Sequence, residues 1–315
     1  MNLVVSHWSA NVVVLAAVLA VVAVHLAGLR GLRADARRSG AAVPAGAAVP
    51  AGAGLPAGLA REAIAFYSGL LLLVLAVVSP LGYWAGTFIW LRVLQDIVFG
   101  VYAPPLIVLG APWLVLWRGL GRGPGSGPGH TWSPRATTAT GRVPPSLRSW
   151  PVAVTALFVV VWCGWYVPAL YDAGVHHPVV LALQAVTTLA AGTALWLQLI
   201  GSRPYSPQFG PLYRVMLLAA IVLCSTILGM VLSFGANVLY PVYLGVGHHH
   251  LLSVVFDQQA GGSELWVLVL VPYLIAGIAL LVRWLNEEES QALSLGLDRM
   301  LRAPKSTWPT RTGSR

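Results

Sequence analysis

Residues 265–285 read LWVLVLVPYLIAGIALLVRWL, and Arg283, near the end of this run, is its only charged residue. An α-helix needs about 20 mostly apolar residues to cross the hydrocarbon core of a bilayer, which is about 30 Å thick. The run therefore predicts a membrane-spanning helix. Similar runs recur along the whole chain, so the pattern concerns the fold and not one isolated segment.

The composition of the chain is that of a membrane protein. Of its 315 residues, 57% are hydrophobic and 9% are charged, and the mean hydropathy is +0.75. Soluble domains carry about a quarter charged residues, so a soluble globular enzyme is excluded. The chain contains no P-loop, no G-x-S-x-G motif and no carboxylate pair with acid–base spacing, and we expect it to have no enzymatic activity.

Seven apolar runs predict an all-α, polytopic membrane bundle of seven transmembrane helices. The runs cover residues 8–29, 62–80, 86–103, 150–170, 179–200, 212–234 and 265–285. The third continues past Pro104 and Pro105. Because proline lacks an amide donor and disfavours helix before it, we expect the helix to break there. Residues 106–117 would then form a half-buried or re-entrant piece.

The segments between the runs predict the domain organisation. Residues 1–29 form a first anchor that is not a cleaved signal, because its arginines follow the apolar run instead of preceding it. Residues 30–60 are rich in Ala, Gly and Pro and form a linker. Residues 61–289 form a six-span membrane domain with a flexible loop at 119–148, and residues 290–315 form a tail.

The basic residues predict the orientation of the chain. All but one of the 19 Lys and Arg residues fall in segments that a seven-span arrangement places on one side. They are Arg30, Arg33, Arg37, Arg38, Arg61, Arg118, Arg122, Arg135, Arg142, Arg148, Arg203, Arg214, Arg283, Arg299, Arg302, Lys305, Arg311 and Arg315. By the positive-inside rule this side is the cytoplasm, which puts the N-terminus outside and the C-terminus in the cytoplasm. The net charge of +9 is thus a mark of topology and not a nucleic-acid-binding surface.

The remaining basic residue, Arg92, lies inside the third run. If that run enters the bilayer near Gly86, Arg92 lies about 9 Å deep and Asp96 about 15 Å deep. Residues four apart share a helix face, so the two side chains can pair. Together with Gln95 and Gln184 they form a candidate intramembrane polar site, because charged groups at such depth are costly. The alternative is an ion pair that only orients the helix.

Candidate metal ligands gather in the segments expected outside the cell. They are His176, His177, His248, His249, His250 and Asp257. Imidazole binds copper and zinc well, so copper is the candidate cofactor, although a run of solvated histidines is an equally simple interpretation. Cys163 and Cys224 lie inside apolar runs, where cysteine is commonly a small apolar side chain. His25 has no opposing intramembrane histidine, and we expect no bound haem.

A series of short motifs extends from about residue 61 to residue 289. Its members include Phe66-Tyr67-Ser68-Gly69-Leu70, Ala103-Pro104-Pro105-Leu106, Trp165 to Asp172, Asp257-Gln258-Gln259 and Trp266. Their order and spacing resemble the CtaG family of bacterial cytochrome c oxidase assembly factors, which are associated with caa-type oxidases. The family-motif positions are Pro104, Pro105, Asp172, Asp257, Gln258, Gln259 and Trp266.

The resemblance implies a seven-span protein of the bacterial plasma membrane that helps the oxidase to mature, in connection with copper insertion. Oxidase subunits or copper chaperones would be its partners, besides the lipid bilayer. The family pattern places His-x-x-Gln-His before the Ala-Pro-Pro motif, and its two histidines correspond here to Arg92 and Asp96. Only Gln95 matches. Where the following helix of the family carries Glu-His, this chain has Gln184-Ala185.

Two functions follow from these residues. The first is an assembly factor whose metal site is lost or moved to the outer histidines, so that it acts as a partner of oxidase subunits. The second is a transporter or channel for a small solute or ion, which would use Arg92 and Asp96 as a polar pathway across the bilayer.

Overall fold

The computed structural model describes Trp8 and residues 11–39, 57–121, 150–202, 207, 209–245 and 252–302. Most of these residues are helical, and none of them lies in a β-strand. Six of the described helices are long and apolar enough to cross a membrane, and a seventh span is complete if α9 and α10, which meet at 67°, count as one. The predicted all-α fold is confirmed, and the predicted seven spans fit this bundle.

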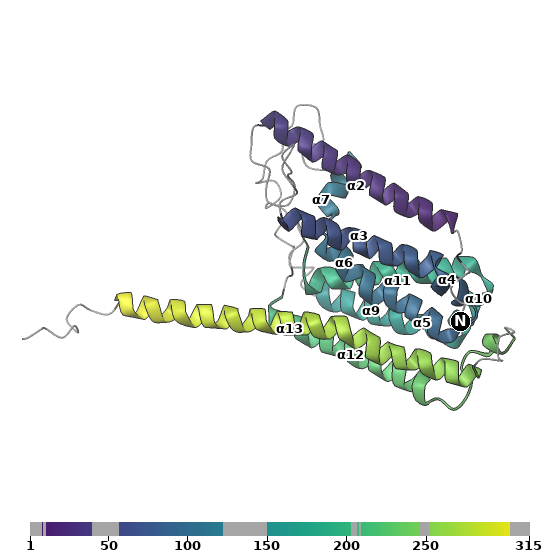
Figure 1. Ribbon diagram of the computed structural model, residues 1–315. Helices are drawn as coiled ribbons and strands as arrows, with labels where there is room; N and C mark the ends of the chain where they lie inside the picture. The colour runs from purple at the N-terminus through teal and green to yellow at the C-terminus, as the bar shows by residue number, and fades with distance from the viewer. Residues whose placement is uncertain are drawn as a thin grey trace, which may run out of the picture.

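The helices run back and forth through one bundle, as Figure 1 shows. The long elements are α2 (Val12–Ser39), α3 (Ala57–Val78), α5 (Ile89–Ile97) with η1 (Val98–Tyr102) and α6 (Ala103–Leu109), α9 (Trp150–Trp165) with α10 (Pro168–His176), α11 (Pro178–Leu199), α12 (Pro211–Phe234) and α13 (Val254–Arg302). The short ones are α4 (Pro80–Trp84), α7 (Trp113–Gly119) and η3 (Pro241–Leu244).

The alternating directions of the helices give the bundle two distinct ends. We call one the arginine end: α2 and α11 end there, α3 and α12 begin there, and α13 extends beyond it (Figure 1). At the other end, which we call the opposite end, lie the connections from α3 to α5, from α10 to α11 and from α12 to α13. The predicted basic segments therefore attach to a single end of the bundle.

The central span does not break at Pro104 and Pro105, and that prediction is wrong. Residues 89–109 form one continuous span of 21 residues. α5 passes into the π turn η1, in which the amide of Ala103 donates to the carbonyl of Val98, and α6 begins directly after it. Because the two prolines occupy the first turn of this new segment, their missing amide donors cost little.

Of the predicted half-buried piece at residues 106–117, residues 106–109 belong to the central span, and only the part from residue 110 onward folds back against the first span. α6 ends at Leu109, the chain turns at Ala111, where φ is 42°, and α7 follows as a short, partly buried helix. Gly28 on α2 faces the carbonyl oxygen of Val115, and Gly119 on α7 faces the carbonyl oxygen of Val24 on α2. A Cβ at either glycine would therefore collide with the backbone of the other helix. The predicted half-buried piece thus attaches α2 to the bundle.

Several other boundaries differ from the predicted ones. α13 begins at Val254, eleven residues before the apolar run at 265, and α5 begins at Ile89 instead of residue 86. Residues 30–39 of the predicted linker belong to α2, and residues 290–302 of the predicted tail belong to α13. The α13 boundary was missed because its first two turns carry polar side chains, which suggest a loop until their buried partners are known.

The main hydrophobic core lies among α5, α9, α11, α12 and α13. α11 approaches the central span closely because Gly192 faces the carbonyl oxygen of Gly100. Trp162 and Trp196 are buried beside this contact, and the Trp196 ring stacks on Tyr273 with centroids 5.3 Å apart. Small residues that let helices approach are the usual means of packing in a membrane, where apolar burial alone favours no helix contact.

Candidate functional site

Three polar side chains join α5 to α11 inside the bundle. The Nη2 of Arg92 donates to Oε1 of Gln184 at 2.7 Å, and Nε2 of Gln184 donates to Oδ2 of Asp96 at 2.8 Å. All three side chains are buried, with Arg92 only 1% exposed. The predicted Arg92–Asp96 pair is therefore linked through the amide of Gln184, which sequence proximity alone could not indicate.

Aromatic residues enclose the guanidinium of Arg92. Its Cζ lies 4.3 Å from the centre of the Tyr171 ring, a cation–π geometry. The far side of this ring stacks on Tyr240 at 4.2 Å between centroids. A Cβ at Gly174 would collide with Nη2 of Arg92, so the glycine makes room for the cation. We call Arg92, Asp96, Gln184 and Tyr171 the Arg92 cluster.

Some buried polar atoms of the Arg92 cluster have no hydrogen-bond partner among the described residues. Within the described part of the chain, neither Nε of Arg92 nor the Tyr171 hydroxyl has a hydrogen-bond partner. Arg92 lies three residues from the start of α5 and Asp96 seven, which corresponds to about 4.5 Å and 10 Å along the helix axis. The cluster therefore lies closer to the opposite end of the bundle than the predicted start of the span implied.

Gln95 does not join the Arg92 cluster but bonds to α3. Its Nε2 donates to the carbonyl oxygen of Ala76 at 2.7 Å. In a regular helix that carbonyl would accept the amide of residue 80, but residue 80 is proline and has no amide hydrogen. The side chain thus satisfies a carbonyl that Pro80 leaves free, as a bilayer requires of any exposed backbone group.

Tyr102 likewise donates a hydrogen bond to a carbonyl that a proline leaves free, in this case on α13. Its hydroxyl donates to the carbonyl oxygen of Leu268 at 2.9 Å. That carbonyl stands four residues before Pro272, which lies inside the helix and offers no amide. Side chains of the central span therefore donate to carbonyl groups that prolines leave without a partner on two neighbouring helices, α3 and α13. These hydrogen bonds join both helices to the central span.

The Asp-Gln-Gln motif at the start of α13 binds backbone. Oδ2 of Asp257 accepts the amide of Ile89 at 2.8 Å and Oδ1 accepts that of Trp90 at 3.0 Å. The carboxylate thereby caps the first turn of α5, where a negative charge is favourable. Gln258 accepts the amide of Leu239 at 2.8 Å, and Gln259 donates to a nearby carbonyl of the same connection at 3.3 Å.

The predicted metal ligands do not converge in the described structure. His176 and His177 are exposed where α10 meets α11, whereas Asp257 is buried and uses both oxygens on α5. His248, His249 and His250 lie outside the described residues. Among the residues that are described, no three His, Cys, Asp or Glu side chains form a group that could hold a metal ion.

The other histidine and cysteine candidates have neighbours within the bundle. His25 is buried on α2, where Nδ1 lies 3.0 Å from the Tyr67 hydroxyl and the ring stacks on Phe66. Cys163 and Cys224 are free thiols, partly buried on α9 and α12. The contacts of His25 explain why a polar side chain is present in an apolar helix without requiring a ligand.

The remaining family-motif positions serve different places in the fold. Pro104 and Pro105 start α6. Asp172 is half-buried on α10, close to the aromatic rings around Arg92, and Trp266 is 38% exposed on α13. The motif thus marks helix starts and helix contacts, and it does not assemble into one pocket.

Two charged residues within helices were missed from sequence. Oε2 of Glu264 is buried on α13 with no hydrogen-bond partner among the described residues. The apolar run predicted from the sequence begins one residue later, at residue 265, so Glu264 lies just outside the predicted span. Arg214, which the sequence places among the basic residues of one side, lies in the first turn of α12 and donates to the carbonyl oxygen of Leu199 at 2.7 Å. It caps the end of α11, where a cation is favourable.

Known proteins that resemble this chain do so over only part of their own length. Relatives include an uncharacterized protein of Mycobacterium bovis and one of Mycobacterium tuberculosis, each 24% identical over 245 residues. The matched region is 73% of this chain but 35% of each relative, so the chain spans about a third of their length. No solved structure matches.

The model of one protein family covers most of the chain. It is described as the cytochrome c oxidase caa3 assembly factor family, and it matches residues 46–287. The match includes the whole of the Arg92 cluster and every span from α3 to α13, and it leaves out only the first span and the two ends. The chain therefore belongs to the cytochrome c oxidase caa3 assembly factor family, CtaG.

Proposed function

We propose that the protein is an assembly factor for a caa3-type cytochrome c oxidase in the bacterial plasma membrane. The observation that carries this proposal is the family match over residues 46–287. The gathering of basic segments at the arginine end supports an orientation with that end in the cytoplasm, the N-terminus outside and the C-terminus inside. The opposite end, with the Arg92 cluster beneath it, would then face the oxidase domains outside.

The Arg92 cluster does not fit a copper ion. A guanidinium has no lone pair to offer and its charge repels a cation, and the oxygen of Gln184 that could ligate already accepts from Arg92. We therefore derive no copper step at this place. The proposed role of the cluster is to fix α5, α10 and α11 so that the opposite end presents one defined surface to oxidase subunits.

A connection with copper insertion would instead use the outer histidines. His176 and His177 are exposed at the opposite end, and the triplet His248 to His250 lies in the sequence between α12 and α13. Measurement of copper in the purified protein, before and after replacement of the triplet by alanine, tests this part. Stoichiometric copper that disappears in the variant supports it, and no copper in either sample overturns it.

The assembly function itself is tested in cells. Deletion of the gene in its host should lower the haem a absorbance and the activity of the caa3 oxidase, and the intact gene should restore both. Normal oxidase in the deletion strain would contradict the proposal. Complementation with the triplet variant separates oxidase assembly from copper binding. If this variant has lost its copper but still restores the oxidase, the assembly function does not need the metal.

Transport of a small solute or ion is the second candidate. The buried chain from Arg92 through Gln184 to Asp96 favours it, because polar groups inside a membrane commonly mark a pathway. Replacement of Arg92 and Asp96 together by leucine should abolish such transport. Unchanged flux in proteoliposomes with the double variant would remove transport, whereas oxidase assembly could continue.

A further inference from the structure

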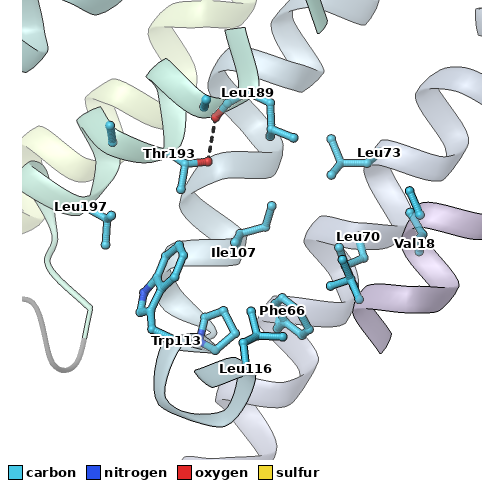
Figure 2. Close-up of a pocket in the computed structure, with 15 residues that line it drawn as sticks. Val18, Phe66, Leu70, Leu73, Ile107, Trp113, Leu116, Leu189, Thr193 and Leu197 are labelled. Carbon is cyan, nitrogen blue, oxygen red and sulfur yellow. Dashed lines mark hydrogen bonds between the residues drawn. The ribbon is translucent and has the colours of Figure 1, made fainter. Parts of the chain in front are cut away.

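We propose that the cavity between α2 and the rest of the bundle binds one acyl chain of an anionic phospholipid, with its headgroup at the arginine end. The cavity has a volume of about 500 Å³. Figure 2 shows side chains of α2 and α3 on one side of it and side chains of α11 on the other, with Ile107 and Trp113 between them. We call this space the α2 crevice.

The lining of the α2 crevice selects a hydrocarbon. Its side chains are apolar apart from the indole of Trp113 and the hydroxyl of Thr193. The Trp113 Nε1 donates to Ser202 at 2.9 Å, and the Thr193 hydroxyl donates to the carbonyl of Leu189 at 2.7 Å. Since both polar groups are already bonded within the protein, the crevice offers a ligand only dispersion contacts and apolar surface.

The α2 crevice, with a volume of about 500 Å³, suits a thin and extended ligand. An α-helix with its side chains is about 10–12 Å across, whereas a single extended chain of methylene groups is far thinner. We therefore take an acyl chain, and not a further transmembrane helix, as the occupant.

The way α2 is attached leaves the α2 crevice open. At the arginine end α2 touches α7 through backbone, beside Gly28 and Gly119. Farther along the helix Ala17 and Val18 line the cavity, and Leu19 is 66% exposed. A lipid chain can thus enter the crevice sideways, between α2 and the bundle, with its headgroup beside the α2–α7 contact at the arginine end.

Positive charge at the arginine end supplies a place for the headgroup. Arg30 on α2 and Arg61 on α3 are exposed there, and Glu62, next to Arg61, interacts within the protein. Phe66, in the lining, lies five residues from Arg61, and Leu73, deeper in the lining, lies twelve. These separations are about 7.5 Å and 18 Å along α3, which matches one leaflet, half of the 30 Å hydrocarbon core. Anionic lipid is the class of headgroup that arginines attract.

Native mass spectrometry of the full chain, reconstituted in nanodiscs of equal parts phosphatidylglycerol and phosphatidylcholine, tests the proposal. We expect one phosphatidylglycerol molecule to remain bound on release. Ala190→Trp places an indole into the α2 crevice from an exposed position of its lining and should lower the lipid-bound fraction about tenfold. Leu71→Trp, at a 57% exposed position of α3 outside the lining, is the matched control and should retain the lipid.

The headgroup is tested separately from the chain. Arg30→Gln with Arg61→Gln should lower the preference for phosphatidylglycerol over phosphatidylcholine about tenfold, and Arg283→Gln, an exposed arginine on α13, should not. Absence of bound lipid in the wild-type protein would overturn the proposal. So would equal retention by Ala190→Trp and Leu71→Trp, or equal binding of the two lipids by the wild-type protein.

Discussion

The Arg92 cluster and the α2 crevice differ in how their surroundings are packed. Around Arg92, buried polar side chains from two spans bond to one another and a tyrosine ring covers the cation. Around the α2 crevice, apolar side chains border a volume of about 500 Å³. The comparison shows that the charged residues form the tightly held part of this membrane protein, whereas α2, which is the least buried of the described spans, is the loosely held part.

The largest effect should follow from removal of the buried cation. Arg92→Leu leaves the buried Asp96 carboxyl without a cation and deprives Gln184 of its donor, so the free energy of unfolding should fall by about 3–5 kcal/mol. Unfolding of the purified protein in mixed micelles, followed by circular dichroism, measures this loss. A loss below about 1 kcal/mol would mean that the cluster is not tightly held.

Truncation of an apolar side chain should separate the two regions next. Leu195 on α11 is fully buried in the main core and Leu19 on α2 is 66% exposed. Leu195→Ala should cost about 2–5 kcal/mol because it leaves a cavity, and Leu19→Ala should stay within about 0.5 kcal/mol. The same unfolding assay compares them. Equal costs for both variants would show that α2 is as firmly packed as the core.

Removal of the Asp257 cap should have an intermediate effect. Asp257→Ala deprives the amides of Ile89 and Trp90 of their acceptor, which should cost up to about 2 kcal/mol. Asp257→Asn keeps one carboxamide oxygen and should cost less. If the two variants lose stability equally, both carboxylate oxygens are needed, and if neither does, the cap does not stabilise α5.

The smallest effect should come from the hydrogen bond of Tyr102. Tyr102→Phe removes the donor to the Leu268 carbonyl and should cost about 1 kcal/mol. In a Pro272→Ala background residue 272 supplies its own amide, so the same substitution should then cost almost nothing. Hydrogen–deuterium exchange and unfolding of the four proteins measure the difference. An equal cost in both backgrounds would show that the tyrosine does not compensate for the proline.

Much of the architecture could be predicted from the sequence because hydropathy and arginine spacing report directly on the bilayer. The polar start of α13 could not, since Asp257, Gln258 and Gln259 resemble a loop until their partners on other elements are known. The π turn before Pro104 likewise depends on packing against α11. The spacing of four residues predicts that Arg92 and Asp96 share a helix face. The amide of Gln184 that bridges them comes from another helix, so it could not be predicted from their spacing.

The central claim is that the charges of Arg92 and Asp96, joined through Gln184, compensate each other inside the bundle. A double-mutant cycle of Arg92→Leu, Asp96→Leu and the combined variant, measured as the free energy of unfolding, tests it most directly. We predict that each single variant loses about 3–5 kcal/mol and that the combined variant regains most of that loss, because no buried charge remains unpaired. A combined loss equal to the sum of the two single losses would contradict the account.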